Sequence, residues 1–249
     1  MAAADVLGPA VLPYPEQEPS PPVDIPTLLN DPQRVHFDPK IHLRFDLPEK
    51  VYTLEDLKYP FKQQAGNVAA TDPFPIFTRE AIVEMRRELF AARTFQNCMS
   101  KRRAGSVQIR GAAPQYAPFV YEAWTHPATL AAVERVVGCR VVTKLDQDIA
   151  HTNVQLTESG LAGLAHIPAE PIEPLPSSAD VQEEEDIAED KDTDVIGWHH
   201  DMYPFSLTVA LSLPTGKGGE TALMCHDGTI MKAQKPDVVS SKYLGYSYT

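Results

Sequence analysis

Long apolar runs are missing from this sequence. A membrane-spanning helix needs about 20 consecutive apolar residues, and no such stretch occurs among the 249 residues. The first residues, Met1–Asp5, also lack the basic and apolar segments of a secretory leader. These absences predict an intracellular protein, cytoplasmic in location, with no membrane as a partner.

Cysteines are few, and they form no pattern. Cys98, Cys139 and Cys225 are three in number and far apart. This spacing excludes a disulfide framework and the paired cysteines of a zinc site. We expect all three to serve as small buried apolar residues.

Basic residues are in the minority. Lys and Arg number 22 against 34 Asp and Glu, so the formal net charge is -12. A charge of this sign opposes non-specific attraction to nucleic acid and to anionic membranes. We therefore expect no nucleic-acid partner, and composition does not indicate an oligomeric state.

Proline divides the chain into regions. Residues 1–50 are rich in proline and are expected to form an extended, partly disordered lead-in laid over the domain. Residues 51–156 are expected to contain flanking helices and the first strands. The periodicity predicts helices over residues 78–95, 115–124 and 125–138, and strands over residues 140–145 and 149–156.

The helix expected over residues 78–95 is amphipathic. Thr78 is its expected N-cap, and Ile82, Met85 and Leu89 form its core stripe. Its three arginines are expected on the solvent face: Arg86, Arg87 and Arg93.

An acidic, proline-rich insertion follows over residues 157–194. Like charges this dense repel one another, and few apolar groups are available for burial, so we expect disorder. A calcium site is the alternative, but the Asp-x-Asp-x-Asp-Gly pattern of a calcium loop is absent. Residues 195–237 form the next region, and residues 238–249 are an atypical tail.

A histidine and a carboxylate stand two residues apart at the start of residues 195–237. In an extended strand side chains alternate between faces, so His199 and Asp201 point the same way and His200 points oppositely. These two residues supply two of the three ligands of a 2-His-1-carboxylate Fe(II) site. The alternative is that His199 is an ordinary hydrogen-bonded core residue.

Strand patterns continue after this motif. Residues 206–213 alternate polar and apolar, residues 214–219 break the pattern, and residues 220–224 resume it. Asp227-Gly228 is a favoured two-residue turn, which predicts a hairpin with residues 229–233 as its second strand.

This region resembles fungal members of the Fe(II)/2-oxoglutarate-dependent dioxygenases. The resemblance lies in three runs, Gly197-Trp198-His199-His200-Asp201, Tyr203-Pro204-Phe205 and Gly218-Gly219-Glu220-Thr221. The resemblance implies an α+β, mainly β fold, a double-stranded β-helix or jelly roll with flanking N-terminal helices. It implies that His199 and Asp201 hold Fe(II) and that Thr221 contacts the co-substrate 2-oxoglutarate. The implied activity is oxidation of a C–H bond of a small organic substrate by molecular oxygen.

The same resemblance calls for a distal histidine and a later arginine or lysine that binds 2-oxoglutarate. The only histidine after Asp201 is His226, which is expected at a hairpin tip, and no arginine follows Gly228. We therefore expect a C-terminally truncated chain that lacks the last strands and is inactive as given, with a tail from about Val238 that derives from an intron read as coding sequence. The alternatives are a non-catalytic β-helix or cupin-like binding protein and an Fe(II) oxygenase of the same fold that uses no 2-oxoglutarate.

Overall fold

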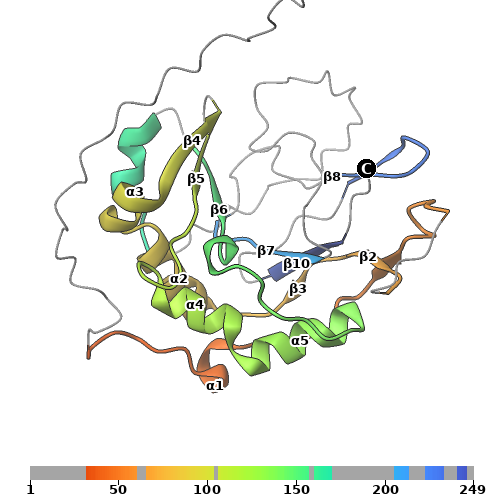
Figure 1. Ribbon diagram of the computed structural model, residues 1–249, viewed down its shortest axis with the longest axis horizontal. Helices are drawn as coiled ribbons and strands as arrows, with labels where there is room; N and C mark the ends of the chain where they lie inside the picture. Colours follow the sequence, from red (N-terminus) through yellow and green to blue (C-terminus); the bar gives the residue numbers. More distant parts are fainter. Residues whose placement is uncertain are drawn as a thin grey trace, which may run out of the picture.

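The structure is a computed structural model that describes residues 32–60, 66–103, 106–156, 160–169, 205–212, 222–232 and 240–245. Figure 1 traces its elements along the chain. In order they are α1 (Pro39–His42), β1 (Val51–Thr53), β2 (Val68–Thr71), β3 (Phe74–Pro75), α2 (Arg79–Leu89), α3 (Ala92–Cys98), β4 (Met99–Arg103), β5 (Ser106–Ile109), α4 (Pro118–Thr125), α5 (Pro127–Val137), η2 (Asp146–Asp148), β6 (Thr152–Gln155), η3 (Gly160–His166), β7 (Phe205–Val209), β8 (Ala222–Met224), β9 (Ile230–Lys232) and β10 (Ser240–Gly245).

The largest sheet has five antiparallel strands, and β10 lies in its middle. One edge of β10 pairs with β7, with Ser241 opposite Val209 and Gly245 opposite Phe205. The other edge pairs with β3 and then with β2, and β1 extends the sheet beyond β2. The sequence predicts an atypical tail without core strands from about residue 238. The structure differs, because β10 lies within that tail.

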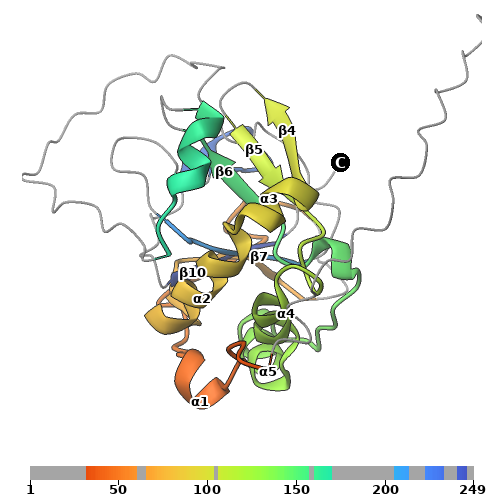
Figure 2. The same cartoon turned by 90° about the vertical axis from the view of Figure 1, so that its left-hand side faces the viewer.

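Helices α2, α4 and α5 cover one face of this sheet (Figures 1 and 2). A single cluster of buried apolar side chains joins the two layers. Its members include Phe74, Ile76 and Phe77 from β3 and the residues after it, Ile82, Met85 and Leu89 from α2, Phe119, Val120 and Ala123 from α4, and Val136 and Val137 from α5. Full burial of a side chain of this size contributes about 1.5–3 kcal/mol. The predicted core stripe of α2 is therefore confirmed.

The helix predicted over residues 78–95 is two helices. Thr78 caps α2 as expected, because its side chain accepts the N–H of Ala81. The chain then turns at Phe90, and Ala91 is extended before α3 begins. The Thr94 hydroxyl donates to the carbonyl of Glu88 at 2.7 Å, which ties the start of α3 to the last turn of α2.

Helix α5 begins and ends where the sequence predicts. The His126 side chain accepts the N–H of Ala128 at 3.1 Å, and Pro127 occupies the first helical position. Gly138 ends the helix in the left-handed conformation, with φ of 76°. The neighbouring helix α4 starts at Pro118, three residues later than the predicted residue 115.

The strand predicted over residues 140–145 is absent, because this segment has no strand partner among the described residues. The N–H of Val141 donates to the Glu134 carboxylate at 3.1 Å, which ties the segment to α5. Val142 is 83% exposed and Leu145 is 51% exposed. A sequence with strand-forming side chains therefore lies beside α5 without a strand partner in the described ranges.

Two smaller antiparallel sheets complete the described part of the molecule. The first has the order β4-β5-β6, and the second is the β8–β9 hairpin. The hairpin packs its Cys225 into a second apolar cluster with Leu54, Leu57 and Ala69. Cys98 is also buried, Cys139 is half-buried, and all three cysteines are free.

The predicted hairpin is present, but its turn is longer than predicted. The N–H of Gly228 donates to the carbonyl of Cys225 at 2.9 Å, so His226 and Asp227 are the central residues of the turn. Gly228 follows with φ of 82°, and the N–H of Cys225 donates to the carbonyl of Thr229. This is the three-residue connection in which a left-handed glycine forms a bulge, not the two-residue Asp-Gly turn.

The structure describes residues 160–169 of the insertion over residues 157–194. The short 3-10 helix η3 lies within it and buries Leu164. The acidic half of the insertion lies outside the described residues, and so does the lead-in before residue 32.

The described part of the chain is thus a mixture of helices and small antiparallel sheets. Its strands do not form a jelly roll, and the double-stranded β-helix stays a prediction. Within the described ranges, none of the helices has the length and apolar character needed to cross a bilayer.

Candidate functional site

The three predicted site residues, His199, Asp201 and Thr221, lie outside the described residues. What the structure describes is the strand that follows the motif. β7 begins at Phe205, four residues after Asp201. Within the described part of the chain, no group of three or more His, Cys, Asp or Glu side chains could hold a metal ion.

Strand β7 alternates between two environments. Phe205, Leu207 and Val209 pack against the main apolar cluster, on the side that the helices cover. Ser206 and Thr208 therefore lie on the opposite face, because successive side chains alternate along a strand. The sequence predicts this alternation, and the structure confirms it.

His226 is not placed in the main apolar core. The backbone N–H of His226 donates to the carbonyl of Leu57 at 3.1 Å. The centroid of its ring lies 5.4 Å from the ring centroid of Tyr59. The imidazole is exposed beside the turn, at the tip of the β8–β9 hairpin. The predicted position of His226 is confirmed, so this residue is a poor candidate for a distal metal ligand.

The β4-β5-β6 sheet has one polar face. Asn153 and Gln155 lie on it together, and the paired residues of β5 are Gln108 and Ser106. Gln108 Nε2 donates to Asn153 Oδ1 at 2.6 Å. Ser106 is 4% exposed, and its hydroxyl has no hydrogen-bond partner in the part of the chain that the structure describes.

Arg86 is placed differently from its prediction. It is 1% exposed, whereas the sequence analysis expects it on the solvent face of the helix. Its guanidinium donates to the backbone carbonyls of Pro168, Ala169 and Leu211 and to the hydroxyl of Ser212, in two segments that are distant in sequence. The signal was present in the spacing, because Met85, Arg86 and Leu89 stand three, four and seven residues after Ile82. Arg86 thus falls inside the apolar stripe.

Glu88 is a second buried charged residue that sequence reasoning missed. Its carboxylate oxygens accept the N–H groups of Phe119 and Val120, each at 3.1 Å, at the start of α4. Burial raises the pKa of Glu88 to about 7, although the two N–H groups and the nearby guanidinium groups of Arg34 and Arg93 act to lower it. A carboxyl group that titrates near neutrality can exchange a proton at physiological pH.

Glu122 holds the end of the described lead-in against α4. Its carboxylate accepts from Arg34 Nη2 at 2.6 Å, from His36 Nδ1 at 3.2 Å and from the N–H of Phe37 at 3.0 Å. Burial acts to raise the pKa of Glu122, but these partners outweigh it and hold the pKa below its usual value. Residues 34–37 therefore form a strap that lies against α4.

Comparison with known proteins identifies no relative. No protein-family model matches this chain, and no characterised protein or solved structure is significantly similar to it. The family resemblance of the His-x-Asp region therefore rests on the residues themselves.

Proposed function

We propose that this protein is of the Fe(II)/2-oxoglutarate-dependent dioxygenase type. His199 and Asp201 would hold Fe(II), and Thr221 would contact 2-oxoglutarate. The donor set fits part of the requirement, because an imidazole and a carboxylate are the ligand types of such iron sites. Among the described residues, no group of three or more His, Cys, Asp or Glu side chains could hold a metal ion.

The observation that carries the proposal is the position of the motif immediately before β7. This strand buries one face, with Leu207 and Val209, against the helix-covered core and leaves Ser206 and Thr208 on the other face. Two metal ligands that stand two residues apart need a rigid strand beside them, because metal ligands must be held in place by the elements that carry them. β7 is five residues long and is paired along its whole length with β10.

When bound, Fe(II) with 2-oxoglutarate would supply the oxidising chemistry that inserts oxygen at a substrate C–H bond. The residues of this chain would bind and orient the metal and co-substrate. A small organic molecule is the proposed substrate, and dioxygen the co-reactant. Without a later histidine other than His226, we expect binding to be weak and turnover by this chain to be negligible.

The test is an anaerobic Fe²⁺ titration of the purified chain, with a coloured chelator as competitor, followed by addition of 2-oxoglutarate. We expect Asp201→Ala and His199→Ala to weaken Fe²⁺ binding by about 10-fold or more, as the loss of a ligand requires. They should also remove the visible charge-transfer band of the iron chelate.

His200→Ala is the matched control, because this adjacent side chain points to the opposite face of an extended strand. It should retain both Fe²⁺ binding and the band. Equal loss in His200→Ala and Asp201→Ala, with folding intact, contradicts the ligand assignment. A wild-type chain with no more Fe²⁺ affinity than Asp201→Ala favours the non-catalytic binding protein instead.

A further inference from the structure

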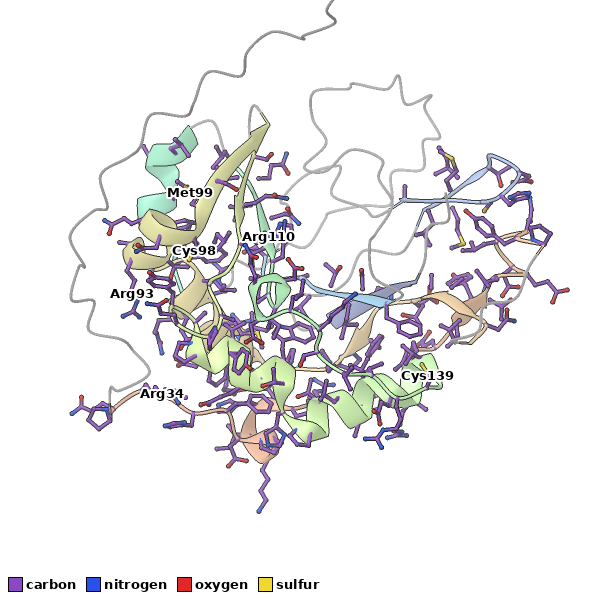
Figure 3. The ribbon with its side chains drawn as sticks, viewed as in Figure 1. Arg34, Arg93, Cys98, Met99, Arg110 and Cys139 are labelled. Carbon is purple, nitrogen blue, oxygen red and sulfur yellow. The ribbon has the colours of Figure 1, made fainter. Side chains whose placement is uncertain are left out.

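The segment between α5 and η2, residues 140–145, lies open on the surface. It runs back beside α5 from Cys139, next to the glycine that ends that helix (Figures 1 and 3). All of its residues are described, and they contain no turn and no bend. Its last residue, Leu145, is extended, with φ of -133° and ψ of 122°. This open segment has the shape of a strand, and no strand pairs with it in the described part of the chain.

The side chains of the open segment are strongly exposed. Val142 has the highest exposed fraction among the described large apolar side chains, 83%, and Leu145 is 51% exposed. The side chain of Arg140 is 94% exposed. An exposed strand is a template for pairing with a further strand, because its backbone N–H and C=O groups offer hydrogen bonds. The open segment is therefore accessible to a strand of another chain.

The two edges of the open segment differ. Along an extended strand, the backbone groups of successive residues point to opposite edges. The N–H of Val141 points toward α5, because it donates to the Glu134 carboxylate at 3.1 Å. The backbone groups of Val142 therefore point away from α5, and within the described part of the chain they form no backbone hydrogen bond. The edge that faces away from α5 is thus the one to which residues 142 and 144 contribute.

Charge determines which register a second copy of this chain can adopt on that edge. An antiparallel register centred on Val142 places Arg140 opposite Lys144 of the second copy, and one centred on Lys144 places two lysines opposite each other. A register centred on Thr143 instead places Arg140 opposite Asp146, at both ends of the pair. Like charges directly opposite destabilise a strand pair, and opposite charges stabilise it. Charge complementarity therefore favours two copies paired about Thr143.

The same register also pairs apolar side chains. Val141 packs against the main apolar cluster. Leu145 lies on the same face of the strand as Val141, because the two residues stand four apart. Pairing about Thr143 places Leu145 of one copy opposite Val141 of the other. It thus covers an exposed leucine of each copy with the apolar cluster of its partner.

We propose that two copies of this chain associate through residues 140–146, paired as antiparallel strands with Thr143 on the two-fold axis. Both copies use the same surface, as in other two-fold dimers. One strand from each copy buries a small area, and small interfaces are typical of weak, transient complexes. The inference is independent of the proposed function.

The experiment uses two charge reversals in the full chain, Arg140→Asp and Asp146→Arg. Each reversed chain by itself places like charges opposite each other at both ends of the strand pair, so its self-association should weaken by about 10-fold or more. An equimolar mixture of the two restores opposite charges at both ends and should dimerise as wild type does. Sedimentation velocity from about 1 µM to about 1 mM measures the association.

Proline substitutions test the edge itself. Val142→Pro removes an N–H from the edge that faces away from α5 and should abolish the dimer. Thr143→Pro is the matched control, because it removes an N–H from the other edge and should keep the dimer.

A cross-link provides a second readout of the register. Facing residues of a non-hydrogen-bonded antiparallel pair have Cα atoms about 4.5 Å apart, within the range of a disulfide. Thr143→Cys should therefore form a disulfide-linked dimer on mild oxidation. Wild type is the control, since Cys98 and Cys225 are buried and Cys139 is half-buried.

The outcomes decide the inference. A wild-type chain that stays monomeric at about 1 mM overturns it, and so does a dimer that persists in both reversed chains, because its interface then lies elsewhere. Reversed chains that remain monomeric when mixed overturn it as well. Asp146 accepts from the Tyr121 hydroxyl at 3.3 Å, so circular dichroism checks the folding of Asp146→Arg. If that variant does not fold, an unchanged dimer in Arg140→Asp or the absence of a cross-link in Thr143→Cys overturns the inference.

Discussion

The carboxylate of Glu88, in α2, accepts the backbone N–H of Phe119, at the start of α4, at 3.1 Å. Val120 donates to the same carboxylate, and the N-cap residue of α4, Ala117, provides no side-chain cap. Pro118 occupies the first helical position and has no N–H to satisfy. Glu88 therefore caps α4 from a different helix, and it does so inside the core.

This arrangement predicts a pH dependence of stability. The pKa of Glu88 rises from its ordinary value of 4.5 to about 7 on folding, chiefly because of burial. Between these two values the folded state binds more protons than the unfolded state, so stability falls as pH rises. A shift of one pKa unit corresponds to about 1.4 kcal/mol, so we expect a loss of about 1–3 kcal/mol between pH 5 and pH 8.

Glu88→Gln should flatten this dependence, because the amide keeps an acceptor for the N–H groups but does not titrate. Urea unfolding at several pH values measures the effect. Glu84→Gln, on the same helix and bonded to exposed Arg87, is the control and should follow wild type. An unchanged slope in Glu88→Gln would show that the titrating group lies elsewhere.

Glu122 should hold the strap formed by residues 34–37. Charge-assisted hydrogen bonds contribute about 1.5–3 kcal/mol each when well formed, and Arg34 has a side chain only 11% exposed. Glu122→Gln should therefore destabilise the protein by about 1–3 kcal/mol and speed amide exchange at Phe37. The folded pKa of Glu122 is lowered, so its contribution is present above pH 4.5 and is lost as pH falls through the folded pKa.

Gly138 should resist substitution for a backbone reason alone. Its φ is 76°, and a Cβ added there would meet nothing within 4 Å. Gly138→Ala should therefore cost about 1–2 kcal/mol, the penalty of the left-handed conformation for a residue with a side chain. Gly138→Asn should cost less, since asparagine tolerates this conformation better. Thermal unfolding of both variants measures the difference, and equal stability of Ala and Gly would contradict it.

Helix ends and strand faces could be predicted from the sequence where a capping residue or an alternating pattern marks them. Thr78 predicts the start of α2, and Gly138 predicts the end of α5, because caps and left-handed glycines act within a few residues. The alternation of β7 was predicted for the same reason. Each of these features is decided by neighbours in the chain.

Features decided by distant partners were predicted wrongly. Val141 and Val142 have strand-forming side chains, but their segment is held by Glu134 of α5 and finds no strand partner among the described residues. The charge of Arg86 predicts a solvent position, whereas its place in the apolar stripe of α2 and its distant acceptors bury it. Its acceptors stand 82 or more residues later, so local sequence could not reveal them. Tertiary contacts override propensity in both cases.

The sequence assigns two metal ligands to the candidate site, His199 and Asp201, which leads to a prediction about turnover. This chain incubated with Fe²⁺, 2-oxoglutarate and dioxygen should release no more succinate than its Asp201→Ala variant. The reason is that loss of a ligand weakens a metal site by at least the 10- to 100-fold that loss of a supporting contact does. Succinate release coupled to a substrate and lost in Asp201→Ala would mean that a third donor exists in this chain.

The last prediction concerns β10, which the structure places between β7 on one side and β2 with β3 on the other. A chain ending at Val239 lacks β10 and leaves the facing edges of β7, β2 and β3 without this partner. A buried backbone group without a partner costs about 1–3 kcal/mol, and total stability is only about 5–15 kcal/mol. The shortened chain should therefore lose cooperative unfolding and the amide protection of β7.

A chain ending at Gly245 keeps β10 and is the matched control. Should the chain ending at Val239 unfold at the same temperature as the control, with β7 equally protected, β10 is no part of the sheet, and the tail is dispensable as its sequence suggests.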